Sequence, residues 1–347
     1  MDRIDLKNLT MQELVEVVAG LGEKKFRAAQ LYDWMHKKEA CSVAEMTNLP
    51  EALRKRLSEQ FDYTVLTKVV ELVSKIDGTR KYLFRLADGN VIESVRMEYH
   101  HGVSVCISSQ VGCRMGCTFC ASTLGGLVRN LSAAEMLEQI YSIERLTGEK
   151  VSNVVVMGSG EPLDNFDNLV KFIQMLCSED GRNISHRNVT VSTCGLADRL
   201  KALADLNLGI NPAVSLHAPN DAMRRKLMPV ANRYSIAELM EAVDYYFEKT
   251  GRRMTFEYSL IRDQNDTPAC AGELAALLKG RNCLVNLIPV NPVSERNYER
   301  PAGPNVQTFQ KLLEKAGINV TIRREMGSDI NAACGQLRRH YEEESRG

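Results

Sequence analysis

Three cysteines, Cys113, Cys117 and Cys120, stand four and three residues apart in the segment VGCRMGCTFCAS. Cysteine thiolates are the usual ligands of iron–sulfur clusters, so this spacing can hold one [4Fe–4S] cluster. Three ligands leave one iron open, and that iron can bind the amino and carboxylate groups of S-adenosylmethionine (SAM). A structural zinc ion is the alternative, but zinc usually takes two ligand pairs, and the sequence has no second pair. The motif therefore favours the cluster and SAM as cofactors.

Small polar loops follow several of the expected strands. The loop GSGEP at 158–162 has glycines that allow close backbone approach to a ligand, and its Glu161 can accept hydrogen bonds from the ammonium of SAM. Ser192 follows the next strand and could bond the ribose or carboxylate, while Asn291 follows a later strand and could satisfy the adenine edge. Each loop alone is a weak signal, because a glycine–glutamate turn is most often only a turn and Ser192 could be an ordinary cap. Their shared position after successive strands indicates a SAM site.

The elements that must position these loops alternate between strand and helix from residue 103 onward. Strand-like runs begin at VSVCI (103–107) and recur as far as CLVNLIP (283–289), with INVTIRR (318–324) as a seventh candidate. Capping boxes at Ser132 and Ser235 and a proline after Thr267 mark helix starts between them. Such repeats predict an α/β fold with parallel strands, curved into an incomplete (β/α)6 barrel. The chemistry of such folds lies at the carboxyl ends of the strands.

The remaining segments predict a division into four parts. Residues 1–62 have helical periodicity after a capping box at Thr10 and form a small helical domain. Residues 63–102 change to strand character around the turns Asp77-Gly78 and Asp88-Gly89, which predicts an antiparallel β extension. Residues 103–325 make the barrel, and residues 326–347 make a C-terminal loop and tail.

Composition restricts the partners of the chain. It has 44 basic and 44 acidic side chains, whereas proteins that hold nucleic acid mainly through phosphates are usually basic. Any RNA contact would come from local basic runs, although such runs are more often plain solvated surface than nucleic-acid contacts. These runs are Arg224-Arg225-Lys226 with Arg233, Arg323-Arg324 and Arg338-Arg339.

Several features predict a cytoplasmic enzyme. No apolar run reaches the ~20 residues of a membrane helix, and the charged N-terminal sequence is unlike a signal peptide. The 10 cysteines are too sparse for a disulfide scaffold, and cluster ligands must stay reduced.

At this point the sequence resembles a known family of radical SAM enzymes, the dual-specificity 23S rRNA and tRNA adenine-C2 methyltransferases called RlmN. The matching motifs run through nearly the whole chain and are VCISSQVGCRMGCTFC, MGSGEPLDN, SLHAPND, NLIPVNP and DINAACGQL. The resemblance implies that Cys113, Cys117 and Cys120 hold the cluster. It implies SAM-binding roles for Gly160, Glu161, Ser192, Ser215, Leu216, His217 and Asn291.

The resemblance also gives meaning to three further residues, which otherwise look like buried small side chains and a strand carboxylate. It implies that Cys334 carries a methyl group, that Cys106 resolves the intermediate, and that Glu93 is a general base. The implied reaction uses two SAM molecules, because C2 of adenine is too electron-poor to attack a sulfonium methyl. Cys334 would take the first methyl, and a 5′-deoxyadenosyl radical from the second SAM would activate it for addition to C2. A disulfide between Cys106 and Cys334 would then release the RNA.

The resemblance implies 23S rRNA and tRNA as partners and an electron donor such as flavodoxin. Residues 1–62 contain none of the SAM motifs and are expected to form an RNA-binding accessory domain, and nothing in the sequence indicates more than a monomer. Two other functions remain open. One is the sister activity, an rRNA adenine-C8 methyltransferase of the Cfr type, although Pro162 and the NLIPVNP stretch favour the C2 family. The other is a non-catalytic iron–sulfur RNA-binding protein, which would have no use for Cys334, Cys106 and Glu93 together.

Overall fold

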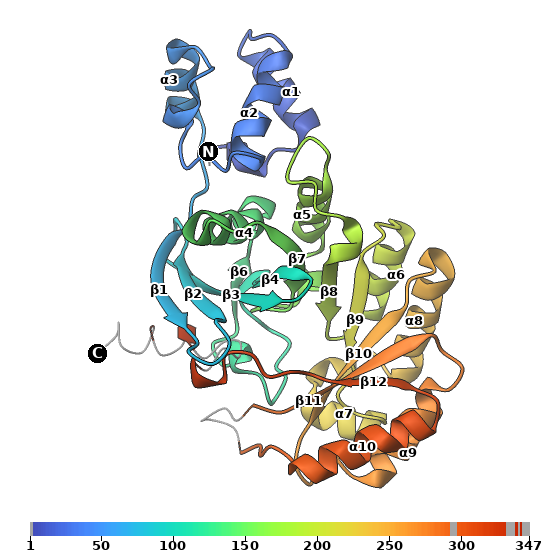
Figure 1. Ribbon diagram of the computed structural model, residues 1–347. Coiled ribbons are helices and arrows are strands. Elements are labelled where there is room, and N and C mark those ends of the chain that lie inside the picture. Colours follow the sequence, from blue (N-terminus) through green and yellow to red (C-terminus); the bar gives the residue numbers. More distant parts are fainter. Residues whose placement is uncertain (1–2, 292–296, 331–336, 339–340, 342–347) are drawn as a thin grey trace.

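A long mixed sheet organises the computed structural model, which describes residues 3–291, 297–330, 337–338 and 341 (Figure 1). Its strand order in the described residues is β1-β2-β3-β4-β7-β8-β9-β10-β11-β12. From β4 to β12 all neighbouring strands pair in parallel, which confirms the predicted barrel and its seventh strand. These parallel strands are β4 (Gly102–Ile107), β7 (Val151–Val156), β8 (Val189–Thr193), β9 (Asn211–Ser215), β10 (Met254–Leu260), β11 (Cys283–Pro289) and β12 (Asn319–Ile322).

Helices follow these strands and cover one face of the curved sheet (Figure 1). Capping boxes are formed where the sequence predicts them, at Ser132 with Glu135 and at Ser235 with Glu238. Thr267 caps the helix that begins at Pro268. The helices are α4 (Ala133–Thr147), α5 (Phe166–Cys177), α6 (Ala197–Asp205), α7 (Asp221–Leu227), α8 (Ile236–Thr250), α9 (Pro268–Leu278) and α10 (Gly303–Lys315).

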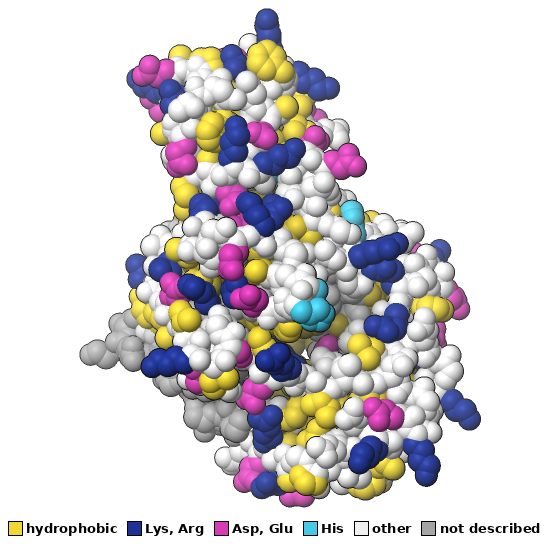
Figure 2. All heavy atoms as spheres, in the orientation of Figure 1, with side chains coloured by type: hydrophobic (Ala, Val, Ile, Leu, Met, Phe, Trp, Pro, Cys, Tyr) yellow, Lys and Arg dark blue, Asp and Glu magenta, His cyan; other side chains and the backbone are white. Residues whose placement is uncertain are grey.

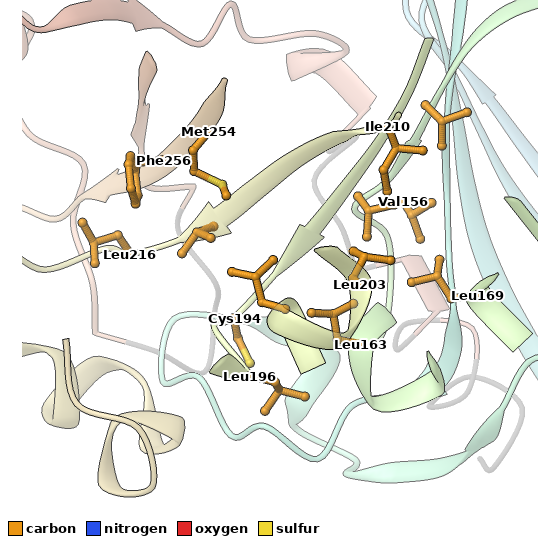
Figure 3. Packing of buried hydrophobic residues seen from close by; sticks show 14 of the residues in the cluster. Val156, Leu163, Leu169, Cys194, Leu196, Leu203, Ile210, Leu216, Met254 and Phe256 are labelled. Atoms are coloured by element: carbon orange, nitrogen blue, oxygen red, sulfur yellow. The ribbon is translucent and has the colours of Figure 1, made fainter. Parts of the chain in front are cut away.

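The core of the barrel lies between the sheet and these helices. Figure 3 shows part of it, with Val156 and Ile210 from the strand side facing Leu203 of α6 and Leu169 of α5. All four side chains are fully buried. Burial of this apolar surface stabilises the strand ends, where the polar loops lie.

An antiparallel extension continues the sheet beyond β4. It consists of β1 (Thr67–Val73), β2 (Arg80–Arg85) and β3 (Val91–Tyr99), and β3 pairs antiparallel with β4. The turn between β1 and β2 contains Gly78 at φ 70°, a left-handed conformation that glycine adopts without strain. This arrangement confirms the predicted β extension.

The N-terminal segment packs around its own apolar cluster. It contains α1 (Met11–Gly20), α2 (Phe26–His36) and α3 (Glu51–Gln60), and α1 starts at the predicted capping box of Thr10. The buried side chains of these helices, such as Leu14, Leu31 and Leu57, form a cluster separate from the barrel core. In Figure 1 the three helices stand apart from the sheet, next to α4 and α5. We call residues 4–62 the helical module.

Buried polar contacts join the helical module to α4. Lys7 Nζ lies 2.8 Å from Glu138 Oε2, and both side chains are almost fully buried. His36 Nδ1 lies 3.0 Å from the hydroxyl of Tyr141. Burial lowers the pKa of His36 to about 3, so this imidazole is neutral near pH 7. All four side chains are at most 1% exposed, so the junction is closed to water.

After β12 the chain returns across the barrel toward the β extension (Figure 1). The N–H of Gly327 donates to Asp77 Oδ2 at 2.9 Å, and the N–H of Lys75 donates to Asp329 Oδ2 at 2.8 Å. Both contacts lie at the turn between β1 and β2. They bring the segment that precedes Cys334 next to the β extension.

Charge is mixed over the surface drawn in Figure 2, where basic and acidic side chains alternate over the module and the barrel. This agrees with the equal numbers of acidic and basic residues. Among the described residues, no helix combines the length and apolar character needed to cross a membrane.

Candidate functional site

The three cysteines of the motif lie in a loop held at its base by a small hairpin. Strands β5 (Gln110–Gly112) and β6 (Leu127–Asn130) pair antiparallel on either side of it, an element that the sequence analysis missed. Gly112 has φ 78°, and a Cβ there would lie 2.0 Å from the carbonyl oxygen of Gly126. The N–H of Cys113 donates to that oxygen at 2.9 Å. Glycine is therefore needed at position 112 to close the loop.

The cysteine loop is also bound to helix α7. The N–H of Thr118 donates to the carbonyl oxygen of Leu227 at 2.9 Å. Within the loop, the hydroxyl of Thr123 donates to the carbonyl oxygens of Cys117 and Cys120. These bonds hold the backbone around the second and third cysteines.

All three cysteines line one cavity of 340 Å³ at the carboxyl ends of the strands. Burial raises the pKa of the Cys113 thiol to about 12 and also raises the pKa of Cys117. The thiols are therefore protonated without a metal, and binding of a cluster must displace their protons. In the described part of the chain, no three His, Cys, Asp or Glu side chains converge on one metal ion. A cubane, in which each thiolate binds a different iron, fits this arrangement better than a zinc ion.

The loop after β7 brings Glu161 to the same cavity. Its carboxylate accepts from the N–H of Leu163 at 3.0 Å and from the N–H of Cys194 at 2.7 Å. Burial raises the pKa of Glu161, while these backbone donors lower it. A carboxylate has lone pairs for further donors, so Glu161 can still accept from an ammonium group. Gly160 has φ 108°, and a Cβ there would lie 2.6 Å from the side chain of Gln110.

Serine and histidine side chains from the next strands complete the wall. The hydroxyls of Ser192 and Ser215 lie 3.5 Å apart at the ends of β8 and β9. His217 has a left-handed φ of 56°, and its Nδ1 accepts from the N–H of Ser259 at 2.9 Å. Burial lowers the pKa of His217 to about 3, so the ring is neutral and its Nε2 carries the hydrogen. His217 can therefore donate one hydrogen bond to a ligand without adding charge.

Most of the residues expected from the sequence meet at this cavity, but not all. Those that line it are Cys106, Cys113, Cys117, Cys120, Gly160, Glu161, Ser192, Ser215, His217 and Asn291. Leu216 does not line it; its side chain is buried in the core, and Figure 3 shows it among the packed residues. Glu93 does not line it either. Cys334 lies outside the described residues.

Glu93 lies on β3, the strand from which Val95 lines the cavity beside Cys106. Cys106 pairs with Val95 across β3 and β4, and Glu93 is two residues before Val95 on the same face of the strand. Its carboxylate lies 3.1 Å from Nζ of the buried Lys81. It also accepts from the N–H of Arg338 at 2.6 Å. Gly327 and Asp329, before Cys334 in the sequence, and Arg338, after it, thus all contact the β extension.

Two further residues were missed by the sequence analysis. Glu257, in the middle of β10, lines the cavity and accepts from Asn286 Nδ2 at 2.9 Å. Burial raises its pKa. A carboxylate inside the otherwise uncharged strand MTFEYSL was the available signal. Arg224, expected at the surface in a basic run, is fully buried, so that expectation is wrong. The neighbouring Arg225 and Lys226 are exposed as expected.

Comparison with known proteins extends these observations. The model for the N-terminal domain of ribosomal RNA large subunit methyltransferases matches residues 4–62, and the radical SAM superfamily model matches residues 107–269. A probable dual-specificity RNA methyltransferase RlmN from Lachnospira eligens is 62% identical over 340 residues, which cover 98% of this chain and 97% of that protein. Its counterpart from Lachnoclostridium phytofermentans is 60% identical over 340 residues, with 98% and 96% covered.

A solved structure has the same fold. The crystal structure of a radical SAM methyltransferase from Sphaerobacter thermophilus superposes with a TM-score of 0.92 at 43% identity, covering 96% of this chain and 98% of that chain.

The partial barrel and its cysteine-lined cavity are those of a radical SAM enzyme. The chain belongs to the RlmN family of dual-specificity RNA methyltransferases. It is a SAM-dependent RNA methyltransferase, and its cofactors are a [4Fe–4S] cluster and SAM.

Proposed function

We propose that this enzyme methylates C2 of an adenine in the peptidyl-transferase centre of 23S rRNA and of the adenine 3′ of the anticodon in tRNA. The name dual-specificity RNA methyltransferase, given to its relatives, supports two classes of RNA substrate. C2 lies between two ring nitrogens and is electron-poor, so it does not attack the methyl group of SAM directly. The proposed route therefore passes the carbon through a protein cysteine and uses two SAM molecules per turnover.

The proposed roles centre on Cys334, Cys106 and Glu93. The Cys334 thiolate takes a methyl group from the first SAM. Cys113, Cys117 and Cys120 would hold the cluster, which would supply one electron for cleavage of the second SAM into methionine and a 5′-deoxyadenosyl radical. That radical would take a hydrogen atom from the S-methyl group of Cys334 and leave as 5′-deoxyadenosine, and the remaining methylene carbon would add to C2 of the adenine. Glu93 accepts the C2 proton. Cys106 would attack the sulfur of Cys334, so that the disulfide forms as the carbon–sulfur bond breaks and the RNA is released. The freed methylene carbon would take up a proton to become the methyl group, and the surplus electron would return to the cluster.

The positions of Cys106 and Glu93 support this proposal. Cys106 lines the same cavity as the three cluster cysteines. Four residues after Cys334, the backbone of Arg338 donates to Glu93, on the strand that pairs with the strand of Cys106. Glu93 also forms an ion pair with the buried Lys81, which holds its carboxylate in place. The disulfide must be reduced after each turnover, so we propose the cytoplasm as the location.

SAM binding is proposed for the polar groups around the cavity. Glu161 would accept from the ammonium, and the hydroxyls of Ser192 and Ser215 would bond the ribose or carboxylate. His217 would donate through Nε2, and Asn291 would satisfy the adenine edge. Leu216 could take part only through its backbone, because its side chain is buried away from the cavity.

We retain the four-part division of the chain as a proposal, with residues 1–62 binding RNA, 63–102 as the extension, 103–325 as the barrel and 326–347 carrying Cys334. The separate apolar cluster of the helical module supports the first boundary. The enzyme would act as a monomer.

The electron donor would dock behind the cysteine loop. Met115 lines both the cysteine cavity and a second hollow of 540 Å³. Arg114, Arg199 and Arg233 also line this second hollow. The side chains of Arg114 and Arg233 are 63% and 73% exposed and pair with Asp164 and Asp198 of the same hollow, which are 10% and 53% exposed. Three arginines thus stand against two carboxylates, which leaves a net charge of +1. This surface would favour an acidic one-electron carrier, such as flavodoxin.

A pair of cysteine variants tests the proposed reaction. Cys334→Ala should abolish methylation and leave no covalent RNA complex, because no methyl carbon is placed for addition. Cys106→Ala should be equally inactive but should trap RNA covalently, since the adduct cannot be resolved. Denaturing gels separate the two outcomes. A folded, cluster-loaded Cys106→Ala enzyme without RNA-linked protein would refute the assigned roles.

Mass spectrometry of the product nucleosides then identifies the methylated atom. 2-Methyladenosine in both rRNA and tRNA is expected. 8-Methyladenosine would assign the sister C8 activity instead.

A further inference from the structure

The most unusual charge in the barrel is Arg224 on the short helix α7. Its side chain has 0% exposure. Nη2 donates to the carbonyl oxygens of Cys194 at 2.6 Å and Ser215 at 3.4 Å, and Nε donates to that of Leu216 at 3.3 Å. Nη1 has no hydrogen-bond partner within the part of the chain that the structure describes. In those residues no carboxylate forms an ion pair with this guanidinium, and Asp221 acts on it only at longer range.

Such a charge is costly to bury. Transfer of an ion from water to a protein interior is strongly unfavourable unless it is paired, and carbonyl dipoles compensate only part of the loss. Burial lowers the pKa of Arg224, although a guanidinium stays protonated at neutral pH. A glycine nevertheless leaves room for the guanidinium of Arg224. Gly195 has φ 100°, and a Cβ at that position would lie only 2.9 Å from Nη2 of Arg224. The fold accommodates a cation that the described residues do not neutralise.

The position of α7 relates this cation to the cysteine loop. The carbonyl oxygen of Leu227, at the end of α7, accepts from the N–H of Thr118 between the second and third cysteines. Arg224 lies within electrostatic range of the thiols of Cys117 and Cys194. It does not line the cavity, so it is out of reach of SAM or RNA bound there. Its influence on that site must therefore be exerted through its charge and through the backbone it contacts.

We propose that Arg224 is the built-in counter-charge of the [4Fe–4S] cluster. A cubane held by three thiolates carries a net charge of about −1 when oxidised and about −2 when reduced. A buried positive charge nearby stabilises both states, and the reduced state more. Arg224 is thus a positioning residue that raises the reduction potential of the cluster and strengthens its retention. This inference rests on the cofactor of the family and is independent of which RNA atom is methylated.

The alternative is a purely structural role, in which the guanidinium ties the ends of β8 and β9 to α7. The two roles predict opposite behaviour for the protein without its cluster. As a counter-charge, Arg224 is an unpaired ion in the cluster-free protein, and its removal should leave that protein at least as stable. As a structural tie, its removal should destabilise the cluster-free protein as well.

The test compares Arg224→Met, which removes the charge, with Arg224→Lys, which keeps it. Arg225→Gln is the matched control, because it removes the same charge from an exposed position on the same helix. Redox titration of the holoenzymes, followed by electron paramagnetic resonance, should show a tenfold less favourable reduction for Arg224→Met, equal to about 59 mV for one electron. Arg224→Lys should retain most of the wild-type potential, and Arg225→Gln should retain all of it. Iron should also be lost faster to a chelator from Arg224→Met.

Urea unfolding of the cluster-free proteins gives the second readout. Arg224→Met and Arg224→Gln should unfold at urea concentrations no lower than the wild type. An unchanged potential in cluster-loaded Arg224→Met overturns the proposal. It is equally overturned if the neutral variants fail to fold without a cluster, because that result assigns Arg224 the structural role.

Discussion

Lys7 and Glu138 form an ion pair of 2.8 Å in which neither side chain is more than 1% exposed, although they are 131 residues apart in sequence. Lys7 belongs to the helical module and Glu138 to α4 of the barrel. Arg145 also binds Glu138, from the outer side of the junction. The pair makes the orientation of the module relative to the barrel depend on buried charges, which tolerate little displacement.

Removal of Lys7 should therefore be costly. Lys7→Met leaves the Glu138 carboxylate buried with Arg145 as its remaining cation, and we expect a loss of about 3 kcal/mol in the free energy of unfolding. Urea unfolding measures the loss. Limited proteolysis should release the module from the variant before the barrel is digested.

A matched control lies at the same junction. Lys171 of α5 and Glu13 of α1 form an ion pair of 2.7 Å, but their side chains are 24% and 45% exposed. Solvent screens such a pair, so Lys171→Met should cost less than about 1 kcal/mol. Equal losses in the two variants would show that burial does not decide the strength of this junction.

Loss of one cluster ligand should remove the cluster. Cys117→Ala is expected to lose most of the about four irons per chain, together with reductive SAM cleavage, under anaerobic conditions. Cys177→Ala is the control, because Cys177 is also buried but lies on α5, away from the cavity. Iron analysis and the absorption spectrum report the result. A full cluster in Cys117→Ala would contradict the ligand assignment.

Acid should destabilise the module–barrel junction through His36. Its folded-state pKa of about 3 lies below the ordinary value of 6.5, so the unfolded chain binds a proton first as pH falls. The stabilisation is present above pH 6.5 and is lost toward pH 3, by up to about 1.4 kcal/mol per pH unit. Glu39, whose pKa burial raises to about 7, acts in the opposite direction.

Because Glu39 is present in both proteins, the difference between wild type and His36→Gln isolates the histidine. Unfolding midpoints measured from pH 7 to pH 5 should fall more steeply for the wild type than for His36→Gln. His100→Gln, at an exposed position, should follow the wild type. Parallel curves for all three proteins would mean that His36 is protonated in the folded state.

The hollow lined by Arg114, Arg199 and Arg233 should affect the rate of cluster reduction only when the electron donor is a protein. A triple variant with Arg114→Gln, Arg199→Gln and Arg233→Gln should be reduced by flavodoxin at least tenfold more slowly at low salt, and the difference should shrink at high salt. Reduction by dithionite, which needs no docking surface, should be unaffected.

The control for this experiment removes three exposed charges elsewhere, with Lys279→Gln, Lys311→Gln and Lys315→Gln. It should behave as the wild type with both reductants. If the arginine variant instead loses RNA affinity and keeps its rate with flavodoxin, the hollow is part of the RNA surface.

Local signals in the sequence predicted the fold well. The capping boxes at Thr10, Ser132 and Ser235 all begin helices, because a capping box satisfies backbone donors within one turn and needs no distant partner. The alternation of strands and helices likewise predicted the parallel sheet. The pairing of β5 with β6 was missed, since it joins two short segments across the cysteine loop.

Charge patterns predicted the site less well. The run Arg224-Arg225-Lys226 was expected at the surface, yet successive residues on a helix point in different directions, and the first of the three faces the core. Glu257 was missed because a strand carboxylate is ordinary until its neighbours are known. Whether such a residue faces a cavity or solvent depends on how the sheet curves, which no local pattern encodes.

The hydrogen bond from Gly327 to Asp77 joins residues 250 positions apart. Contacts of such long sequence separation form late in folding, because a long loop must be closed before they contribute. During synthesis the β extension emerges early, and it must wait for most of the chain to be translated before the segment with Cys334 can bind it. A nascent barrel would therefore be able to acquire its cluster before it can carry a methyl group. Incomplete translation products would contain the iron site without Cys334, the proposed methyl carrier.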